Sequence, residues 1–277
     1  MTAERFDKST SAFPIHAEAM TKGWAKYALQ LTRSMTIKDV ADLLGVTWDV
    51  IKEIKKDDLR KRFANPSLKD VRRIAIDEIC IGKGHRYVKL VMNLDTGAII
   101  LVGDGKSAES LVPFWKRLGR RRHAIEAVAM DMSSAYISAV RGNLPKADIV
   151  FDRFHVVKLM NEKLTTLRRQ AKEYYPKEEL RLFWEETFRW PAQLFLRSWC
   201  NRAIATGLPP LKTMAKTLTR LEDGLLSNFD HRISSGPMEG TNNKIKTVQR
   251  QSYGIRDREY FELLLYSLHE TKYALVG

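Results

Sequence analysis

The sequence contains few cysteines and no long apolar run, and both absences narrow what the chain can be. Only Cys80 and Cys200 occur among the 277 residues, and neither belongs to a C-x-x-C pair. We therefore expect neither a disulfide scaffold nor a structural zinc site. No apolar run approaches the roughly 18 residues needed to cross a bilayer. Residues 1–20 also lack the apolar core of a signal peptide. A cytoplasmic protein with no membrane partner is expected.

Acidic residues are outnumbered. The chain has 33 Asp and Glu against 47 Lys and Arg, a formal net charge of +14. The basic residues gather in segments 52–62, 116–123, 167–172 and 244–258. Such clusters favour a polyanionic partner, because each neutralised phosphate releases condensed counterions. The sequence shows no basic amphipathic helix with an aromatic face, which an anionic membrane would require. Nucleic acid is the expected partner, and the nucleoid is the expected location.

Two short helices are expected near the N-terminus. Thr36 with Asp39 offers a capping box, and Gly45 ends the apolar helical pattern that follows it. Thr47 can cap the second helix. Two helices joined at a glycine turn indicate a helix-turn-helix over about residues 36–57. An ordinary helical hairpin is the alternative, and the basic surroundings favour DNA.

The second of these helices would carry the DNA contacts. At helical spacing its outward residues would reach phosphates or base edges. The candidate contacts are Trp48, Lys52, Lys55 and Lys56.

A linker at residues 65–67 separates this region, residues 1–64, from a second domain over 68–277. The second domain begins with apolar runs at 71–79, 86–94 and 98–104, typical of strands. A helix, a strand at 126–131, another helix and a strand at 147–152 follow. The order β-β-β-α-β-α-β predicts a mixed α/β fold with covering helices. Residues 156–230 form a helical insertion, with Trp184, Trp190 and Trp199 as expected packing anchors.

Asp77 and Asp131 each follow a short apolar run. Ligands gather at strand ends in open mixed sheets. Two carboxylates that meet there repel each other unless a cation holds them. Mg²⁺ accepts carboxylates, waters and substrate phosphates, and two ions about 3.5–4 Å apart can activate the attacking oxygen and stabilise the leaving one. For each aspartate alone, a turn or helix cap is the commoner role.

Glu239 lies at the start of a basic helical segment. Helical spacing places it on one face with Asn242, Lys246 and Arg250. This face suits a metal ion at one end and DNA backbone along the rest, with Lys244 also close to the backbone. The alternative is a first-turn acid favoured by the helix dipole.

Four motifs occur in order along the chain: D-E-x(6)-H-R-Y, D-M-S-x(2)-Y, D-R-F-H and E-G-x-N-N-K-I-K. With them, residues 34–270 resemble the bacterial insertion-sequence transposases of the ISL-three family. That resemblance implies a ribonuclease H-like core with a DDE triad, which falls on Asp77, Asp131 and Glu239 as catalytic and metal-binding residues. It implies Mg²⁺ or Mn²⁺ as cofactor. Asp152 and His155 fall on the D-R-F-H motif, whose role stays open.

The chain departs from that family in lacking paired N-terminal cysteines, which form a zinc-binding region in its members. The leading hypothesis is a transposase that binds terminal inverted repeats and target DNA, cleaves and joins strands, and assembles as a homo-oligomer to hold two ends. One alternative is a truncated, inactive DNA-binding remnant that represses transposition. A metal-dependent nuclease of repair or RNA processing is a weaker one, because such an enzyme needs no helix-turn-helix.

Overall fold

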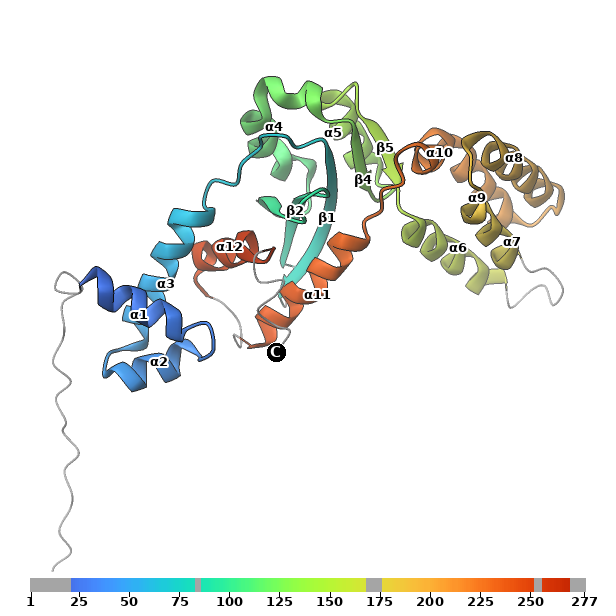
Figure 1. Ribbon diagram of the computed structural model, residues 1–277. Coiled ribbons are helices and arrows are strands. Elements are labelled where there is room, and N and C mark those ends of the chain that lie inside the picture. The colour runs from blue at the N-terminus through green and yellow to red at the C-terminus, as the bar shows by residue number, and fades with distance from the viewer. Residues whose placement is uncertain (1–20, 83–85, 168–175, 252–255, 270–277) are drawn as a thin grey trace, which may run out of the picture. The chain divides into compact units, whose positions relative to one another are not determined.

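The computed structural model describes residues 21–82, 86–167, 176–251 and 256–269 (Figure 1). Its contacts divide the chain into two compact units. One comprises the described parts of Met1–Asn65 and Glu259–Gly277, and the other is Pro66–Arg258. The domain limits expected from the sequence stay a prediction, since compactness alone does not define a domain.

The first unit contains α1 (Lys22–Leu31), α2 (Ile37–Leu44) and α3 (Trp48–Phe63). The capping box at α2 is confirmed: the Thr36 hydroxyl accepts from the Asp39 amide at 3.1 Å. Gly45 ends α2 with φ 66°, a left-handed conformation that glycine adopts without steric cost. Thr47 stands at the start of α3, but its side chain makes no capping hydrogen bond, so that expectation is wrong.

A small apolar core joins these three helices. Its fully buried members are Ala28, Val40, Ala41 and Ile51. The side chains come from α1, α2 and α3 in turn, so each helix contributes its apolar face to the same cluster. The unit therefore has a core of its own.

The second unit is built on a five-stranded mixed sheet with strand order β3-β2-β1-β4-β5. Strands β1 (Arg73–Gly82), β2 (Arg86–Asn93) and β3 (Ile99–Asp104) pair antiparallel. Strands β4 (Ala127–Met130) and β5 (Asp148–Phe151) continue the sheet in parallel. The turn between β2 and β3 contains Gly97 at φ 73°, and its amide donates to the Asn93 carbonyl at 2.8 Å. The predicted mixed α/β class is confirmed.

Helices cover both faces of the sheet (Figure 1). The 3₁₀ segment η2 (Ala108–Leu111), α4 (Val112–Leu118) and α5 (Ser134–Asn143) pack on the face that carries Ile74 and Ile76. Alternation along β1 turns Asp77 to the other face, where α11 (Gly236–Gln251) contacts this strand. The opposite faces of β1 thus serve different purposes, a packed core on one and a polar junction on the other.

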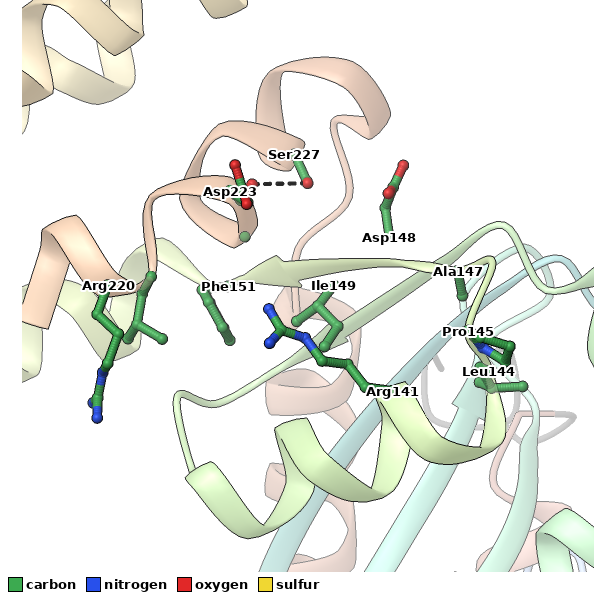
Figure 2. A pocket seen from close by; sticks show the side chains of 12 residues that line it. Arg141, Leu144, Pro145, Ala147, Asp148, Ile149, Phe151, Arg220, Asp223 and Ser227 are labelled. Atoms are coloured by element: carbon green, nitrogen blue, oxygen red, sulfur yellow. Dashed lines mark hydrogen bonds between the residues drawn. The ribbon is translucent and has the colours of Figure 1, made fainter.

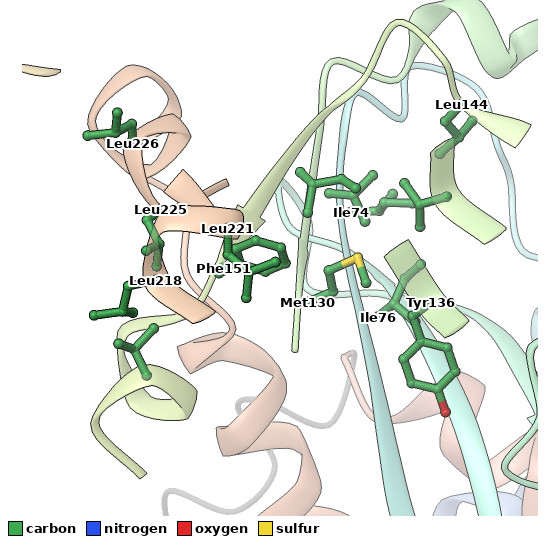
Figure 3. Packing of buried hydrophobic residues seen from close by; sticks show 14 of the residues in the cluster. Ile74, Ile76, Met130, Tyr136, Leu144, Phe151, Leu218, Leu221, Leu225 and Leu226 are labelled. Atoms are coloured by element: carbon green, nitrogen blue, oxygen red, sulfur yellow. The ribbon is translucent and has the colours of Figure 1, made fainter. Parts of the chain in front are cut away.

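The helical insertion comprises α6 (Arg153–Leu167), α7 (Pro176–Leu182), α8 (Arg189–Ala205), α9 (Pro209–Arg220) and α10 (Glu222–His231). It shares one hydrophobic core with the sheet, and Phe151 of β5 lies beside Leu221 (Figure 3). Trp199 is fully buried, and Trp184 packs partly buried against this core. Trp190 is 68% exposed, so its expected role as a packing anchor is wrong.

The last helix is α12 (Arg258–Ser267). In the part of the chain that the structure describes, every helix is too short or too polar to cross a bilayer.

Candidate active site

Asp77 and Asp131 approach each other because of the parallel pairing between β1 and β4. Ala75 pairs with Ala129, and each aspartate lies two residues further along its own strand direction. Residues two apart share a face of a sheet, so both carboxylates extend to the same side. The charge of Asp131 acts on Asp77 and raises its pKa. The structure therefore brings these two residues together.

Asp77 does not end its strand, contrary to the sequence expectation. Strand β1 continues to Gly82, and Asp77 pairs with Leu90 of β2. What ends after Ala75 is the pairing with the shorter strand β4. The carboxylate thus lies where the long strand β1 extends past the end of β4. A sequence pattern alone does not distinguish this position from the end of a strand.

The Asp77 carboxylate is half-buried and well supplied with donors. It accepts from the Glu78 amide at 2.7 Å and from the Asn242 side-chain amide at 2.7 Å. Burial raises the pKa of Asp77, and these two hydrogen bonds together with the charge of His155 oppose that rise. His155, a residue of the D-R-F-H motif, thus contributes to the electrostatics of this carboxylate.

Asp131 also takes part in a turn. Its Oδ1 atom accepts from the Ser133 amide at 3.0 Å, immediately before α5 begins. The Ser133 side chain itself makes no capping bond to α5. The turn role that aspartate commonly plays is thus present at Asp131, and it does not exclude a second role for the other carboxylate oxygen.

Glu239 is exposed in the first turn of α11, one turn before Asn242. Among the residues that the structure describes, no three His, Cys, Asp or Glu side chains come close enough to hold one metal ion. The structure thus joins Asp77 and Asp131 but does not bring Glu239 into a three-ligand group with them. Glu239 is connected to the pair only indirectly, because Asn242 of the same helix donates a hydrogen bond to Asp77.

The donor set fits a magnesium ion. Two carboxylates share one face, and the Oδ1 atom of Asn242 is buried without a hydrogen-bond partner next to Asp77. Mg²⁺ binds hard oxygen ligands and usually takes one or two carboxylates together with waters. Asp77 and Asp131 could supply those carboxylates, and a cation between them would offset their mutual repulsion.

A buried polar network supports the residue after Asp77. Lys89 of β2 is fully buried and donates to the Lys106 carbonyl at 2.6 Å and to the Tyr136 hydroxyl. Tyr136 in turn donates to Glu78 at 2.9 Å. Burial lowers the pKa of Lys89 and raises that of Tyr136. Sequence patterns do not reveal this network, although Glu78 and Tyr136 both belong to the four motifs.

The candidate DNA contacts of α3 differ in accessibility. Trp48 is 53% exposed, and the Lys52 ammonium lies 5.5 Å from the centre of its ring. Burial lowers the pKa of Lys55. Lys56 forms an ion pair with Glu259 at 2.9 Å, and its side chain is only 11% exposed. Trp48 is therefore the exposed contact of this helix and Lys52 is half-buried beside it, whereas Lys56 pairs with Glu259 of the same unit.

The candidate contacts of α11 lie along a helix that begins at the sheet. Lys246 and Arg250 are exposed, and Lys244 is half-buried. Asn242 is engaged by Asp77, so its amide faces the carboxylates instead of solvent. Lys246 and Arg250 lie about two and three helical turns after Glu239, at about 3.6 residues per turn.

A separate cavity of about 360 Å³ lies between β5 and α10 (Figure 2). Its lining includes Arg141, Asp148 and Asp223. Asp148 starts β5, whereas Asp152 follows its end. The lining runs along β5 from Asp148 to Phe151 and does not include Asp77 or Asp131, so the cavity is distinct from the candidate active site.

Comparisons with known proteins show which proteins this chain is similar to. The model of a family described as a transposase, the ISL3 group of DDE transposases, matches residues 74–173 and 171–265. The chain is 27% identical over 296 residues to the transposase for insertion sequence element IS1001 of Bordetella parapertussis, covering 89% of this chain and 73% of that protein. It is 32% identical over 139 residues to the transposase for insertion sequence element IS1557 of Mycobacterium tuberculosis, covering 48% of this chain and 30% of that protein. The family match includes Asp77, Asp131 and Glu239.

Proposed function

Because this chain belongs to the ISL3 family of transposases, we propose that it binds the terminal inverted repeats of its element and cleaves and joins DNA there. The observation that carries the proposal is the placement of Asp77 and Asp131 on one face of the sheet, two residues beyond the paired Ala75 and Ala129. Paired carboxylates of this kind suit divalent-metal phosphodiester chemistry.

In this proposal Asp77 and Asp131 hold Mg²⁺ or Mn²⁺, and Glu239 completes the ligand set. The bound ions supply Lewis-acid activation of the attacking oxygen and charge stabilisation of the leaving one. Asn242 orients the Asp77 carboxylate through its 2.7 Å hydrogen bond. Glu239 reaches the pair in this proposal by rotation of its exposed side chain, while α11 keeps the hydrogen bond from Asn242 to Asp77.

The proposed reaction has two balanced steps. In the first, a water oxygen bonds to phosphorus at the element end, and the bond from phosphorus to the 3′-oxygen breaks. The departing oxygen takes a proton and becomes a free 3′-hydroxyl. In the second, that hydroxyl attacks a phosphodiester in target DNA, and the target's own 3′-oxygen leaves. One P–O bond forms and one breaks in each step, so no external energy source is required.

The DNA contacts in this proposal come from two regions. On α3, the exposed Trp48 and the half-buried Lys52, Lys55 and Lys56 contact the inverted repeat. On α11, Lys244, Lys246 and Arg250 contact the backbone near the reacting phosphate. Because both element ends must be held during joining, we include a homo-oligomer in the proposal.

The test is strand cleavage on DNA that carries the element's own ends, with Mg²⁺ or Mn²⁺. Asp131→Asn keeps the shape of the side chain but removes its charge, and we expect cleavage to fall by at least about 100-fold, the scale of losing a group that stabilises transition-state charge. Asp223→Asn, an exposed aspartate of α10, is the matched control and should cleave like the parent. If Asp131→Asn cleaves as well as the parent, the metal-site assignment is wrong.

The alternative is a DNA-binding protein without catalytic activity that occupies the element ends. The position of Glu239, outside any three-ligand group among the described residues, favours it. Such a protein would bind the inverted repeats with strong salt dependence and would leave them uncut at any metal concentration.

A further inference from the structure

Asp152 is a buried carboxylate with an unusual number of donors. It directly follows β5, is 6% exposed, and accepts from the Ser235 amide at 2.7 Å and from the Ser235 hydroxyl. A third hydrogen bond comes from the Phe154 amide at 2.6 Å. A buried carboxylate is stable only when such donors compensate its lost hydration, and here two of the three come from a residue 83 positions away.

The position of Asp152 relates it to the candidate active site. Met130 of β4 pairs with Phe151 of β5, and these two residues directly precede Asp131 and Asp152. The two aspartates therefore leave the sheet at the same end, on neighbouring strands. Asp152 is occupied by Ser235, however, so its part in the site differs from that of Asp131.

The residue that Asp152 holds is the one from which α11 starts. Ser235 immediately precedes the helix and is 8% exposed. Its carbonyl accepts the Glu239 amide at 2.9 Å, which is a hydrogen bond of the first helical turn. Ser235 thus connects Asp152, at the end of β5, to the backbone of Glu239.

A second bond fastens the same helix one turn later. Asn242 donates to Asp77 at 2.7 Å. Glu239 lies between the two attachments, with Asp152 and Ser235 before it and Asn242 after it. Two fixed points on one short stretch of helix determine both its distance from the sheet and its rotation about its own axis. The backbone of Glu239 is thereby held in place relative to the sheet, and its carboxylate moves only by rotation about side-chain bonds.

We propose that Asp152 is a positioning residue that, through Ser235, fixes the start of α11 so that Glu239 can serve as the third metal ligand. This inference rests on the proposed function, in which Asp77, Asp131 and Glu239 bind the metal. Residues that hold metal ligands in place commonly change metal affinity by about 10–100-fold when they are replaced. Asp152 acts at one remove from the ligand, by way of the helix.

The experiment compares Mn²⁺ binding and hydrogen exchange in the full-length protein. In Asp152→Asn the side chain keeps its shape, but one of its two oxygens becomes an NH2 donor, which must then meet either the Ser235 donors or the Phe154 amide. We expect Mn²⁺ affinity, measured by electron paramagnetic resonance of the free ion, to fall by about 10-fold or more. Hydrogen exchange at the Glu239 amide should accelerate, while amides in β1 and β4 stay protected.

Two serine variants make the test specific. Ser235→Ala removes only the hydroxyl, so it should weaken Mn²⁺ binding less than Asp152→Asn, and Ser235→Thr should restore it. Ser227→Ala is the matched control, because Ser227 is equally buried and donates at 2.9 Å to the Asp223 carbonyl within α10. It should lower the melting temperature without changing Mn²⁺ affinity.

The outcomes separate this inference from the proposed function. If Asp131→Asn weakens Mn²⁺ binding but Asp152→Asn leaves it within twofold of the parent, the positioning role is refuted and the metal site stands. A lower melting temperature in Asp152→Asn with unchanged Mn²⁺ affinity also refutes it, since the residue would then act on the fold alone. If Asp131→Asn itself leaves Mn²⁺ binding unchanged, the proposed metal site falls, and this inference with it.

Discussion

Gly224 of α10 is expected to tolerate no side chain, because it lies against an aromatic ring of the sheet. A Cβ atom added there would stand 2.3 Å from Cε2 and 2.6 Å from Cδ2 of Phe151. Phe151 is buried at the end of β5, and no real contact of a Cβ atom is this short. Gly224→Ala must therefore push α10 away from the strand or turn the ring into its neighbours. Overpacking of this kind costs typically about 1–3 kcal/mol.

Helix propensity acts in the opposite direction and must be separated from the clash. Alanine is better than glycine in a helix by about 0.5–1 kcal/mol. Gly142 of α5 provides the control, because it is exposed and a Cβ there would meet nothing within 4 Å. We expect Gly142→Ala to stabilise the protein by about 0.5–1 kcal/mol and Gly224→Ala to destabilise it despite the same gain. The difference between them, about 1–3 kcal/mol, isolates the steric cost.

The assay is thermal or urea unfolding of the four variants of a double-mutant cycle. For a domain of this size, 1 kcal/mol corresponds to about 2–4 °C in melting temperature. Phe151→Leu removes the ring atoms that collide, so Gly224→Ala should cost much less in that background, with a coupling energy of at least about 1 kcal/mol, inside the range seen for residues in contact. A coupling below 0.5 kcal/mol, or a Gly224→Ala variant as stable as Gly142→Ala, would refute the packing of α10 on β5.

Three further outcomes are expected. Lys246→Ala should weaken DNA binding equally for all sequences and lower the slope of affinity against salt by about 1, whereas Lys216→Ala on α9 should leave that slope unchanged. Tyr136→Phe should cost about 1–3 kcal/mol in urea unfolding, because the hydroxyl that donates to Glu78 at 2.9 Å is lost inside a buried network; a change below 0.5 kcal/mol would contradict the network. Hydrogen bonds from Arg60 and Lys56 lower the pKa of Glu259 from 4.5 to about 2. The stability they confer is therefore present above about pH 4.5 and lost as the pH falls toward 2, and Glu259→Gln should abolish that part of the acid dependence in melting curves.

Local chemistry in the sequence predicts much of the fold. The capping box of Thr36 and Asp39 and the left-handed Gly45 depend on residues within four positions of one another, so a short window contains all the information. The strands are equally local, since alternation and turn residues define them. Even the approach of Asp77 to Asp131 follows from two predicted strands in one sheet, once the parallel pairing of β1 with β4 is assumed.

Sequence patterns do not predict contacts between residues that lie far apart in the chain. Asn242 has the spacing of a DNA-facing residue on α11, yet it donates to a carboxylate 165 positions earlier. Trp190 has the size and apolar character of a core anchor, yet it is 68% exposed. The residues next to Asn242 or Trp190 in the sequence do not indicate either outcome, because each depends on which distant part of the chain packs against that residue.

The same distinction explains why the third carboxylate is the hardest part of the site to place from sequence. Asp77 and Asp131 each lie two residues beyond a register pair of β1 and β4, so the sheet holds the segments that carry them side by side. Glu239 belongs to a helix that joins the sheet through Ser235, Asn242 and Gln249. A shift of α11 by one residue would rotate its side chains by about 100° at 3.6 residues per turn and change the direction of Glu239. The geometry of the complete metal site is thus a property of the junction between sheet and helix, and Asp152 is the residue through which the sheet sets it.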